Sequence, residues 1–240
     1  MKTMAQPHVS IEPAIARLAR LAPLDDADQA LLHVAKTSIR RIAAHREIVA
    51  EGAPIVGTGL ILDGWACRVR FFPDGRRQIL SLLLPGELIG VSRQPRPLAA
   101  TAIAALTDVT VCALPVARTP GLAEAYAISG ALEEHYLFRQ LARLGRLSAY
   151  ERLIDYMLEI RERLGAAAIG DQQSFPMPLT QEVLGDALGL TSVHINRTLQ
   201  AMRRDGLIVL KDGIARLSNV DQLARMVDAR PPRLSRPPSQ

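Results

Sequence analysis

The chain has 240 residues, a hydrophobic content of 48% and a formal net charge of +5, so it is long enough for two domains with real cores. The positive charge is compatible with a polyanionic partner. The two cysteines, Cys67 and Cys112, lie far apart, which excludes a disulfide framework and a cysteine metal site. We expect both to be small buried side chains in a reducing cytoplasm.

Membrane and enzyme classes are not indicated. The first residues lack the apolar core of a signal peptide, and in the mostly apolar segment 98–117 an aspartate, Asp108, would be costly in hydrocarbon. Five histidines are scattered without helical pairing, so we expect no metal site. No Ser/His/Asp cluster and no phosphate-cradling glycine loop is present, and we expect no enzyme activity.

The first 40 residues have helical periodicity. Ile11, Ile15 and Leu18 share one helix face, and the acidic run 25–28 is a start signal for a second helix. Both helices are expected to pack against the segment that follows.

From about residue 42 to 114 the pattern changes to short strands separated by glycine and proline turns. The predicted strands are 47–50, 58–62, 66–72, 78–84, 99–105 and 110–114. Strands at this regular spacing, without helices between them, indicate an antiparallel sandwich or jelly roll. Asp74-Gly75 marks its clearest hairpin, and we expect Arg76 and Arg77 to be the solvated end of that hairpin.

A long helix is predicted from residue 131 to about 147. Its narrow apolar stripe, flanked by Arg139, Arg143 and Arg146, suits a two-helix seam between subunits. The residues expected in this dimer interface are Leu137, Leu141, Leu144 and Leu147. A helix that packs on its own sheet is the alternative. Another helix is predicted for 148–164, followed by a linker at 165–178.

Residues 179–217 contain a helix-turn-helix pattern with a wing. Thr180 caps a short helix that Gly189 ends, and Thr191 or Ser192 starts a second helix. Val193 or Ile195, then Leu199 and Met202, would form the buried face of that second helix. Two short strands joined by an Asp-Gly turn follow, as in the wing of DNA-binding proteins.

In such motifs the second helix lies in the DNA major groove. The predicted DNA-binding residues are Thr180, Thr191, Ser192, Val193, His194, Asn196, Arg197, Gln200, Arg203, Arg204 and Lys211. Arg197 is suited to guanine and Asn196 to adenine, whereas Arg203 and Arg204 are better placed for phosphates. A last helix is predicted at 220–227 and a disordered proline-rich tail at 229–240.

The order of these elements resembles the Crp/Fnr superfamily of bacterial transcription regulators. The likeness rests on 179–191 and 193–199, and on the roll turns 62–66, 74–79 and 84–88. The resemblance implies an α+β fold: an antiparallel, jelly-roll-like β-roll sensor domain with N-terminal helices (1–125), dimerisation and connecting helices (126–165), a winged helix-turn-helix domain (166–230) and a disordered tail (231–240).

The resemblance also carries over site residues, with departures. It gives Ser192, Val193, Asn196 and Arg197 as the base-reading set, but well-known members have a glutamate where this chain has Val193. The usual family operator is therefore not assumed, because a carboxylate that accepts a hydrogen bond from cytosine is missing.

In the roll, the resemblance implies an effector site at Gly86 and Glu87. The arginine and serine that hold the phosphate in cyclic-nucleotide members fall here at Ala99 and Ala100. Arg93 or Arg96 is the only substitute we find. Cyclic AMP is thus disfavoured, and an iron-sulfur cluster is too, because the N-terminal cysteine cluster is absent; we expect no cofactor and leave the effector open.

The function implied is a homodimeric, sequence-specific DNA-binding regulator of a palindromic operator, with a signal sensed at the roll. Its partners would be double-stranded DNA, a second copy of the chain and, for an activator rather than a repressor, RNA polymerase. The alternative is a small-molecule sensor that acts through protein contacts and has a degenerate DNA-binding domain.

Overall fold

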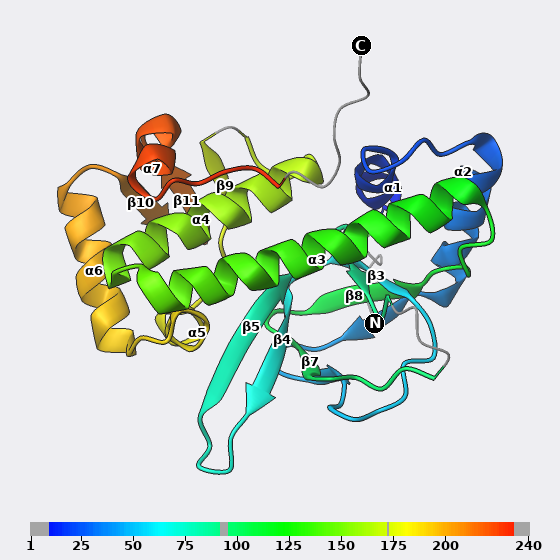
Figure 1. The fold of residues 1–240 in the computed structure, drawn as a ribbon, viewed down its shortest axis with the longest axis horizontal. Coiled ribbons are helices and arrows are strands. Elements are labelled where there is room, and N and C mark those ends of the chain that lie inside the picture. The colour runs from blue at the N-terminus through cyan, green and yellow to red at the C-terminus, as the bar shows by residue number, and fades with distance from the viewer. Residues whose placement is uncertain (1–9, 92–95, 172, 233–240) are drawn as a thin grey trace, which may run out of the picture.

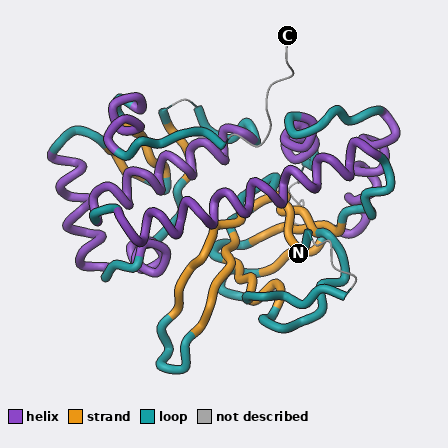
Figure 2. The backbone as a smooth tube through the Cα atoms, viewed as in Figure 1, coloured by secondary structure: helices purple, strands orange, loops and turns teal. Residues whose placement is uncertain are grey.

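The computed structural model describes residues 10–91, 96–171 and 173–232. In these residues a pair of short helices precedes a β-roll, two long helices follow it, and a small sheet with three short helices completes the fold (Figures 1 and 2). The predicted tail at 229–240 lies largely outside the described residues, which end at 232.

The N-terminal helices form as the sequence predicts. They are α1 (Glu12–Ala19), α2 (Asp26–Val34) and the 3-10 turn η1 (Ala35–Ser38). A reciprocal capping box begins α2: the Asp28 amide donates to the Asp25 carboxylate at 2.8 Å, and the Asp25 amide donates to Asp28 at 3.2 Å. Leu18 of α1 and Ile11, the N-cap of that helix, are buried in one cluster with Leu60 and Leu122, so this helix is part of the first core.

The roll consists of two four-stranded antiparallel sheets among the described residues. Their orders are β1-β8-β3-β6 and β2-β7-β4-β5. The strands are β1 (Arg40–Ile42), β2 (Glu47–Val49), β3 (Gly59–Asp63), β4 (Ala66–Phe71), β5 (Arg77–Leu83), β6 (Leu88–Ile89), β7 (Ala102–Ala105) and β8 (Val109–Ala113). Ile61, Leu83, Ile103 and Val111 fill the space between the sheets. The jelly-roll-like prediction is confirmed, although β1 and β6 are too short for their pattern to be recognised.

Both cysteines lie inside the roll. Cys67 and Cys112 are buried and unpaired with each other. Burial raises the pKa of the Cys67 thiol to about 12 and that of Cys112 to about 11. Both thiols are therefore protonated at neutral pH and act as apolar side chains.

The long helix starts earlier than the leucine pattern predicts. α3 runs from Pro120 to Arg146, with Thr119 as its N-cap and Pro120 in its first turn, where a missing amide costs nothing. Pro120 and Gly121, which the sequence alone leaves open as a short helix or a turn, form the first turn of this long helix. Figure 1 shows α3 running from the N-terminal helices past the roll to the far end of the molecule. It therefore touches both ends of the protein.

After a break at Leu147, α4 (Ala149–Ala166) and the elements that follow it form what we call the winged unit. These are β9 (Ser174–Pro176), α5 (Gln181–Leu188), α6 (Ser192–Arg204), β10 (Ile208–Lys211), β11 (Ile214–Leu217) and α7 (Val220–Met226). Leu153, Leu184, Leu199 and Leu223 share one core. That core continues into Trp65 and Leu82, so the winged unit packs directly on the roll.

The predicted linker at 165–178 is partly wrong. β9 lies within it and pairs antiparallel with β11, giving the sheet order β10-β11-β9. Phe175, which is 1% exposed, fills the core of the winged unit from this strand. A three-residue strand next to prolines gives no alternating pattern, which is why the sequence did not reveal it.

Among the described residues, none of the helices has both the length and the apolar character that crossing a membrane requires.

Gly185 in α5 offers a test of the packing at the turn. A Cβ at this position would lie 2.5 Å from the carbonyl oxygen of Leu190, which is backbone and cannot move aside cheaply. We expect Gly185→Ala to lower the free energy of unfolding by about 1 to 3 kcal/mol. Chemical denaturation measures this.

Gly165→Ala is the matched control, because Gly165 is also helical and a Cβ added there would meet nothing within 4 Å. Alanine is the better helix former by about 1 kcal/mol, so this variant should be neutral or slightly more stable. Equal destabilisation by both substitutions would contradict the steric argument.

Candidate nucleic-acid interface and roll pocket

The turn between α5 and α6 is built from caps and one glycine. The Val183 amide donates to the Thr180 hydroxyl at 3.2 Å at the start of α5. Gly189, with φ +64°, takes the left-handed conformation that ends this helix, and the Leu190 amide then donates to the Gly185 carbonyl at 3.1 Å. This geometry directs the chain from α5 into α6.

The structure decides the two alternatives left open for α6. Thr191 is the N-cap, because its hydroxyl accepts from the His194 amide at 3.2 Å. Ile195 is fully buried whereas Val193 is 66% exposed, so Val193 belongs to the outer face. Leu199 and Met202 complete the buried face as predicted.

The predicted DNA-binding residues gather on one side of the winged unit. Ten of the eleven are exposed and Asn196 is half-buried; the hydroxyl of Thr180 is already engaged as the cap of α5. Ser192, Val193, Asn196, Arg197 and Gln200 line one shallow groove along α6. Thr180, Arg203 and Lys211 line a second hollow, where α5, α6 and the wing meet. Thr191, His194 and Arg204 are exposed near the groove but do not line either hollow.

The wing is a tight hairpin. Lys211 pairs with Ile214, and the two residues between them, Asp212 and Gly213, have φ values of +51° and +73°. Two left-handed residues in a two-residue loop match the twist of the strands, as the Asp-Gly sequence predicts. The wing therefore presents Lys211 beside α6.

Positive charge on this face is not neutralised by the part of the chain that the structure describes. Within the described ranges, Arg197, Arg203, Arg204 and Lys211 have no ion pair with a carboxylate. Cations left without partners in the free protein are available to phosphates and base edges.

One groove residue was missed at the sequence level. Gln181, at the first position of α5, lines the same groove as Asn196, and its Oε1 accepts a hydrogen bond from Asn196 Nδ2 at 3.1 Å. A bonded amide has a fixed orientation, so Gln181 presets the side chain that we expect to meet a base. Its place next to the Thr180 cap was the available signal.

The roll also touches α5. We expected Arg76 and Arg77 to be a solvated hairpin end, and this holds only for Arg76, whose partner is Asp74. Arg77 Nε instead donates to Asp186 at 2.6 Å, because the β4–β5 hairpin runs alongside α5. The sequence does not show that the hairpin and α5 are neighbours.

The last carbonyl groups of α5 receive side-chain donors from three other elements. Gln140 of α3 donates to the Ala187 carbonyl at 2.6 Å, and Gln78 of the roll reaches the same oxygen at 3.3 Å. Arg152 of α4 donates to the Leu188 carbonyl at 3.0 Å. These bonds satisfy acceptors that a helix end leaves open, and they fix α5 against its neighbours.

The predicted dimer residues of α3 divide into two groups. Leu137 is 37% and Leu141 71% exposed, whereas Leu144 and Leu147 are half-buried, with Leu144 against Gly189 of the turn. Phe138, 63% exposed, lies next to the exposed pair and was missed. The outward apolar surface of α3 is therefore Leu137, Phe138 and Leu141.

The arginines expected to flank the seam do not all do so. Arg143 is only 1% exposed, and it binds Asp155 at 2.7 Å and Glu159 at 2.5 Å on α4. Arg139 also binds Asp155, at 2.7 Å. Placing Arg143 beside the seam was wrong, because a row of carboxylates on α4 draws these arginines to the inner side of α3.

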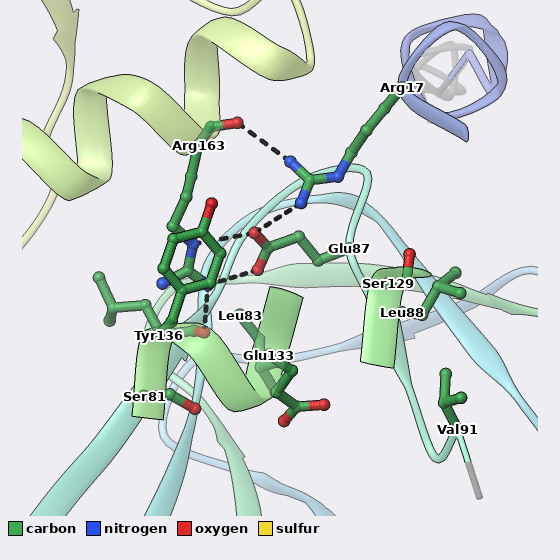
Figure 3. Close-up of a pocket in the computed structure, with 11 residues that line it drawn as sticks. Arg17, Ser81, Leu83, Glu87, Leu88, Val91, Ser129, Glu133, Tyr136 and Arg163 are labelled. Carbon is green, nitrogen blue, oxygen red and sulfur yellow. Dashed lines mark hydrogen bonds and ion pairs between the residues drawn. The ribbon is translucent and has the colours of Figure 1, made fainter. Parts of the chain in front are cut away.

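Glu87 of the predicted effector site is buried and fully bonded (Figure 3). Its Oε1 accepts from Arg163 Nε at 2.9 Å and from Arg17 Nη2 at 3.1 Å. Its Oε2 accepts from Arg163 Nη2 at 2.6 Å and from the Leu84 amide at 3.0 Å. Burial by itself would raise the pKa of Glu87, but Arg163 and then Arg17 outweigh it, so the pKa lies below its usual value.

The other predicted effector residues do not complete a phosphate site. Gly86 has a φ of +85°, and a Cβ added at this position would lie 2.9 Å from Arg17 Cδ. Glycine therefore leaves room for the Arg17 side chain. Arg96 is exposed, and Arg93 lies outside the described residues. Ala99 is buried and Ala100 exposed. Glu87 is thus bonded to groups of the protein itself, namely Arg17, Arg163 and the Leu84 amide.

This architecture defines a class: a cyclic-nucleotide-binding-type roll joined by a long helix to a winged helix-turn-helix. Two family models match accordingly, the cyclic nucleotide-binding domain at residues 39–126 and the Crp-like helix-turn-helix domain at residues 151–236. Individual relatives and solved structures agree with these two matches.

Among the curated relatives is the transcriptional activator protein FnrL of Cereibacter sphaeroides, 28% identical over 183 residues, or 72% of this chain and 73% of that protein. The nitrogen fixation regulation protein FixK of Bradyrhizobium diazoefficiens is 32% identical over 158 residues, covering 64% and 66%. The structure of FixK2 from Bradyrhizobium japonicum has a similar fold, with a TM-score of 0.70 at 23% identity, over 81% of this chain and 98% of that one.

The chain belongs to the Crp/Fnr family of transcription regulators, and it has that family's helix-turn-helix DNA-binding domain.

The Gln181–Asn196 pair generates a prediction about base preference. Without its partner the Asn196 amide is free to rotate, so Gln181→Ala should reduce discrimination at the base pair facing Asn196, by up to about 1.4 kcal/mol or tenfold. Selection of bound sequences from a random DNA pool reads this preference position by position.

Gln222→Ala is the matched control. Gln222 of α7 forms the same kind of amide pair, with Asn219 at 3.0 Å, outside the groove. This variant should select the same sequences as the parent protein. An unchanged preference in Gln181→Ala would show that Gln181 does not position Asn196.

Proposed function

We propose that the protein is a cytoplasmic homodimeric regulator in which each subunit places α6 in the major groove of one half of a palindromic operator. One observation carries the proposal: α6 buries Ile195, Leu199 and Met202 in its own core. Its opposite side presents the half-buried Asn196 amide and the exposed Arg197, which has no ion pair within the described residues. A helix of this kind has a recognition face.

The side chains of that face have separate tasks. Arg197 suits the two acceptors of guanine and Asn196 the acceptor and donor of adenine. Arg203, Arg204 and Lys211 lie further along α6 and on the wing, where phosphates pass, so they add affinity without base preference. Val193 offers a methyl-bearing surface in place of a carboxylate, which favours a thymine methyl over cytosine.

Dimerisation is supported by the outward apolar surface of α3. Leu137, Phe138 and Leu141 project together from a helix whose other side is packed on α4 and the roll. Exposed apolar groups aligned on a long helix suit pairing with the same helix of a second copy. A twofold dimer would meet half-sites about one helical turn apart.

We further propose that the regulator is an activator that contacts RNA polymerase. The support comes from the relatives, of which FnrL is a transcriptional activator by name. The alternative is a sensor with a degenerate DNA-binding domain. It is disfavoured by the left-handed Gly189 turn and by Arg197, which is exposed and has no ion pair with any residue that the structure describes. Genome-wide crosslinking separates the two, since the alternative predicts no discrete DNA sites.

Arg197→Ala tests the base-reading assignment. The variant should lose about 1 to 3 kcal/mol of binding on the selected operator and relax preference at the base pair that Arg197 faces. A gel-shift titration with the operator and single-base variants of it measures both effects. Unchanged affinity for the operator would contradict the assignment.

Arg203→Ala is the matched variant, because it removes the same kind of side chain from the same helix. It should weaken binding to all duplexes alike and reduce the slope of log K against log salt by about 1. A sequence-dependent loss would mean that Arg203 reads bases.

Leu141→Glu tests the dimer. A charge at the centre of the apolar surface would have to be buried in the seam, so the variant should sediment as a monomer and lose binding to the palindrome. Val116→Glu, at a position that is 74% exposed outside α3, should remain a dimer. A Leu141→Glu protein that stays dimeric would place the interface elsewhere.

A further inference from the structure

The roll does not fit a cyclic nucleotide, although the family that matches it is named for that ligand. Both oxygens of Glu87 are already bound by Arg17, Arg163 and the Leu84 amide. The space that remains between Arg17, Ser81 and Tyr136 is about 20 Å³, room for about one water. A nucleotide would have to displace two guanidinium groups from a buried carboxylate.

We propose that Arg17 and Arg163 take the place of a ligand, so that the roll is joined to the winged unit without any cyclic nucleotide. Arg17, Glu87 and Arg163, which we name the Glu87 cluster, come from three different parts of the chain: α1, the β5–β6 turn and α4 (Figure 3). Each is less than 9% exposed. A buried ion pair is costly to break on one side, which makes this connection rigid.

The connection continues from the Glu87 cluster toward α5. Arg163 binds Glu159 at 2.8 Å, and Glu159 binds Arg143 at 2.5 Å. Arg143 donates to the Gln140 side-chain oxygen, and the Gln140 amide donates to the Ala187 carbonyl at 2.6 Å. An unbroken series of side-chain contacts thus links the β5–β6 turn of the roll to α5, the helix that precedes α6.

The N-terminal helix clamps the same end of α4. Arg17 Nη1 donates to the Arg163 carbonyl at 3.1 Å, and Arg20 Nη1 donates to the carbonyls of Gly165 and Ala166 at 3.1 Å each. Cationic donors at a helix C-terminus satisfy its open carbonyls and suit its dipole. α1 therefore holds both the roll turn and the end of α4.

The connection should affect how tightly the protein binds DNA. This expected effect rests on the proposed function, whereas the connection itself does not. The Glu87 cluster holds α4 in place. Because α4 packs against α5 and α6, these two helices are then fixed relative to the roll before the protein meets DNA. Loosening the cluster adds freedom that must be lost again on binding, so affinity falls.

The first experiment asks whether the roll takes a ligand. Cyclic AMP, cyclic GMP and cyclic di-GMP at millimolar concentration are titrated into the full-length protein in a calorimeter, and operator affinity is measured with and without each. We expect no saturable heat and no change in affinity. One-to-one binding of any of the three, or an operator affinity that depends on it, would overturn the proposal.

The second experiment breaks the cluster. Arg163→Gln should weaken operator binding by about tenfold or more, and hydrogen exchange should rise in α1 and α5. Arg139→Gln is the control, because Arg139 also binds a buried carboxylate between α3 and α4 but does not reach the roll. It should change operator affinity by less than about threefold, well short of the tenfold step that about 1.4 kcal/mol represents.

Glu87→Gln keeps the experiment interpretable if Arg163→Gln does not fold, because it preserves shape and removes only charge. Its operator affinity should also fall, with the fold intact by circular dichroism. Parent-like affinity and exchange in both cluster variants, a gain in affinity, or an equal loss in Arg139→Gln would each overturn the proposal. Failure of the parent protein to bind any selected duplex would instead refute the proposed function, and the exchange data would still report on the cluster.

Discussion

The buried guanidinium of Arg143 is the constraint on which much of this molecule depends. A charge removed from water must be matched by an opposite charge and hydrogen bonds, and Asp155 and Glu159 of α4 supply both. Because these partners are fixed in position, α3 and α4 meet in one register. α3 touches the roll and carries the outward apolar surface, whereas α4 is the base of the winged unit. One ionic row therefore sets how the two ends of the protein are arranged.

The elements that follow local rules could be predicted from the sequence. The capping box at Asp25, the left-handed Gly189 and the Asp-Gly turn of the wing depend only on neighbouring residues, and the structure has all of them. The outer face of α6 followed from periodicity in the same way. The helical period of 3.6 residues places Val193 near the edge of the apolar stripe, so the sequence could not say whether Val193 or Ile195 is buried. The structure shows that Val193 is exposed.

The misses share a physical cause. Arg77, Arg143 and Glu87 are charged residues that a pattern assigns to solvent or to a ligand, yet each is paired with a residue on another element. Pairing between elements leaves no periodic signal. The strand around Phe175 was missed for a related reason, since a three-residue strand is defined by its partner β11 and not by its own sequence. What the sequence left out was therefore mainly the contacts between elements.

Val193 has a consequence at the level of the cell. This exposed place on α6 holds an aliphatic side chain and not a carboxylate. Under the proposed base-reading role of α6, two regulators that share this scaffold and differ at Val193 would bind separate sets of promoters. On that proposal, one substitution would let a duplicated regulator acquire its own group of genes while its core and its wing stay the same.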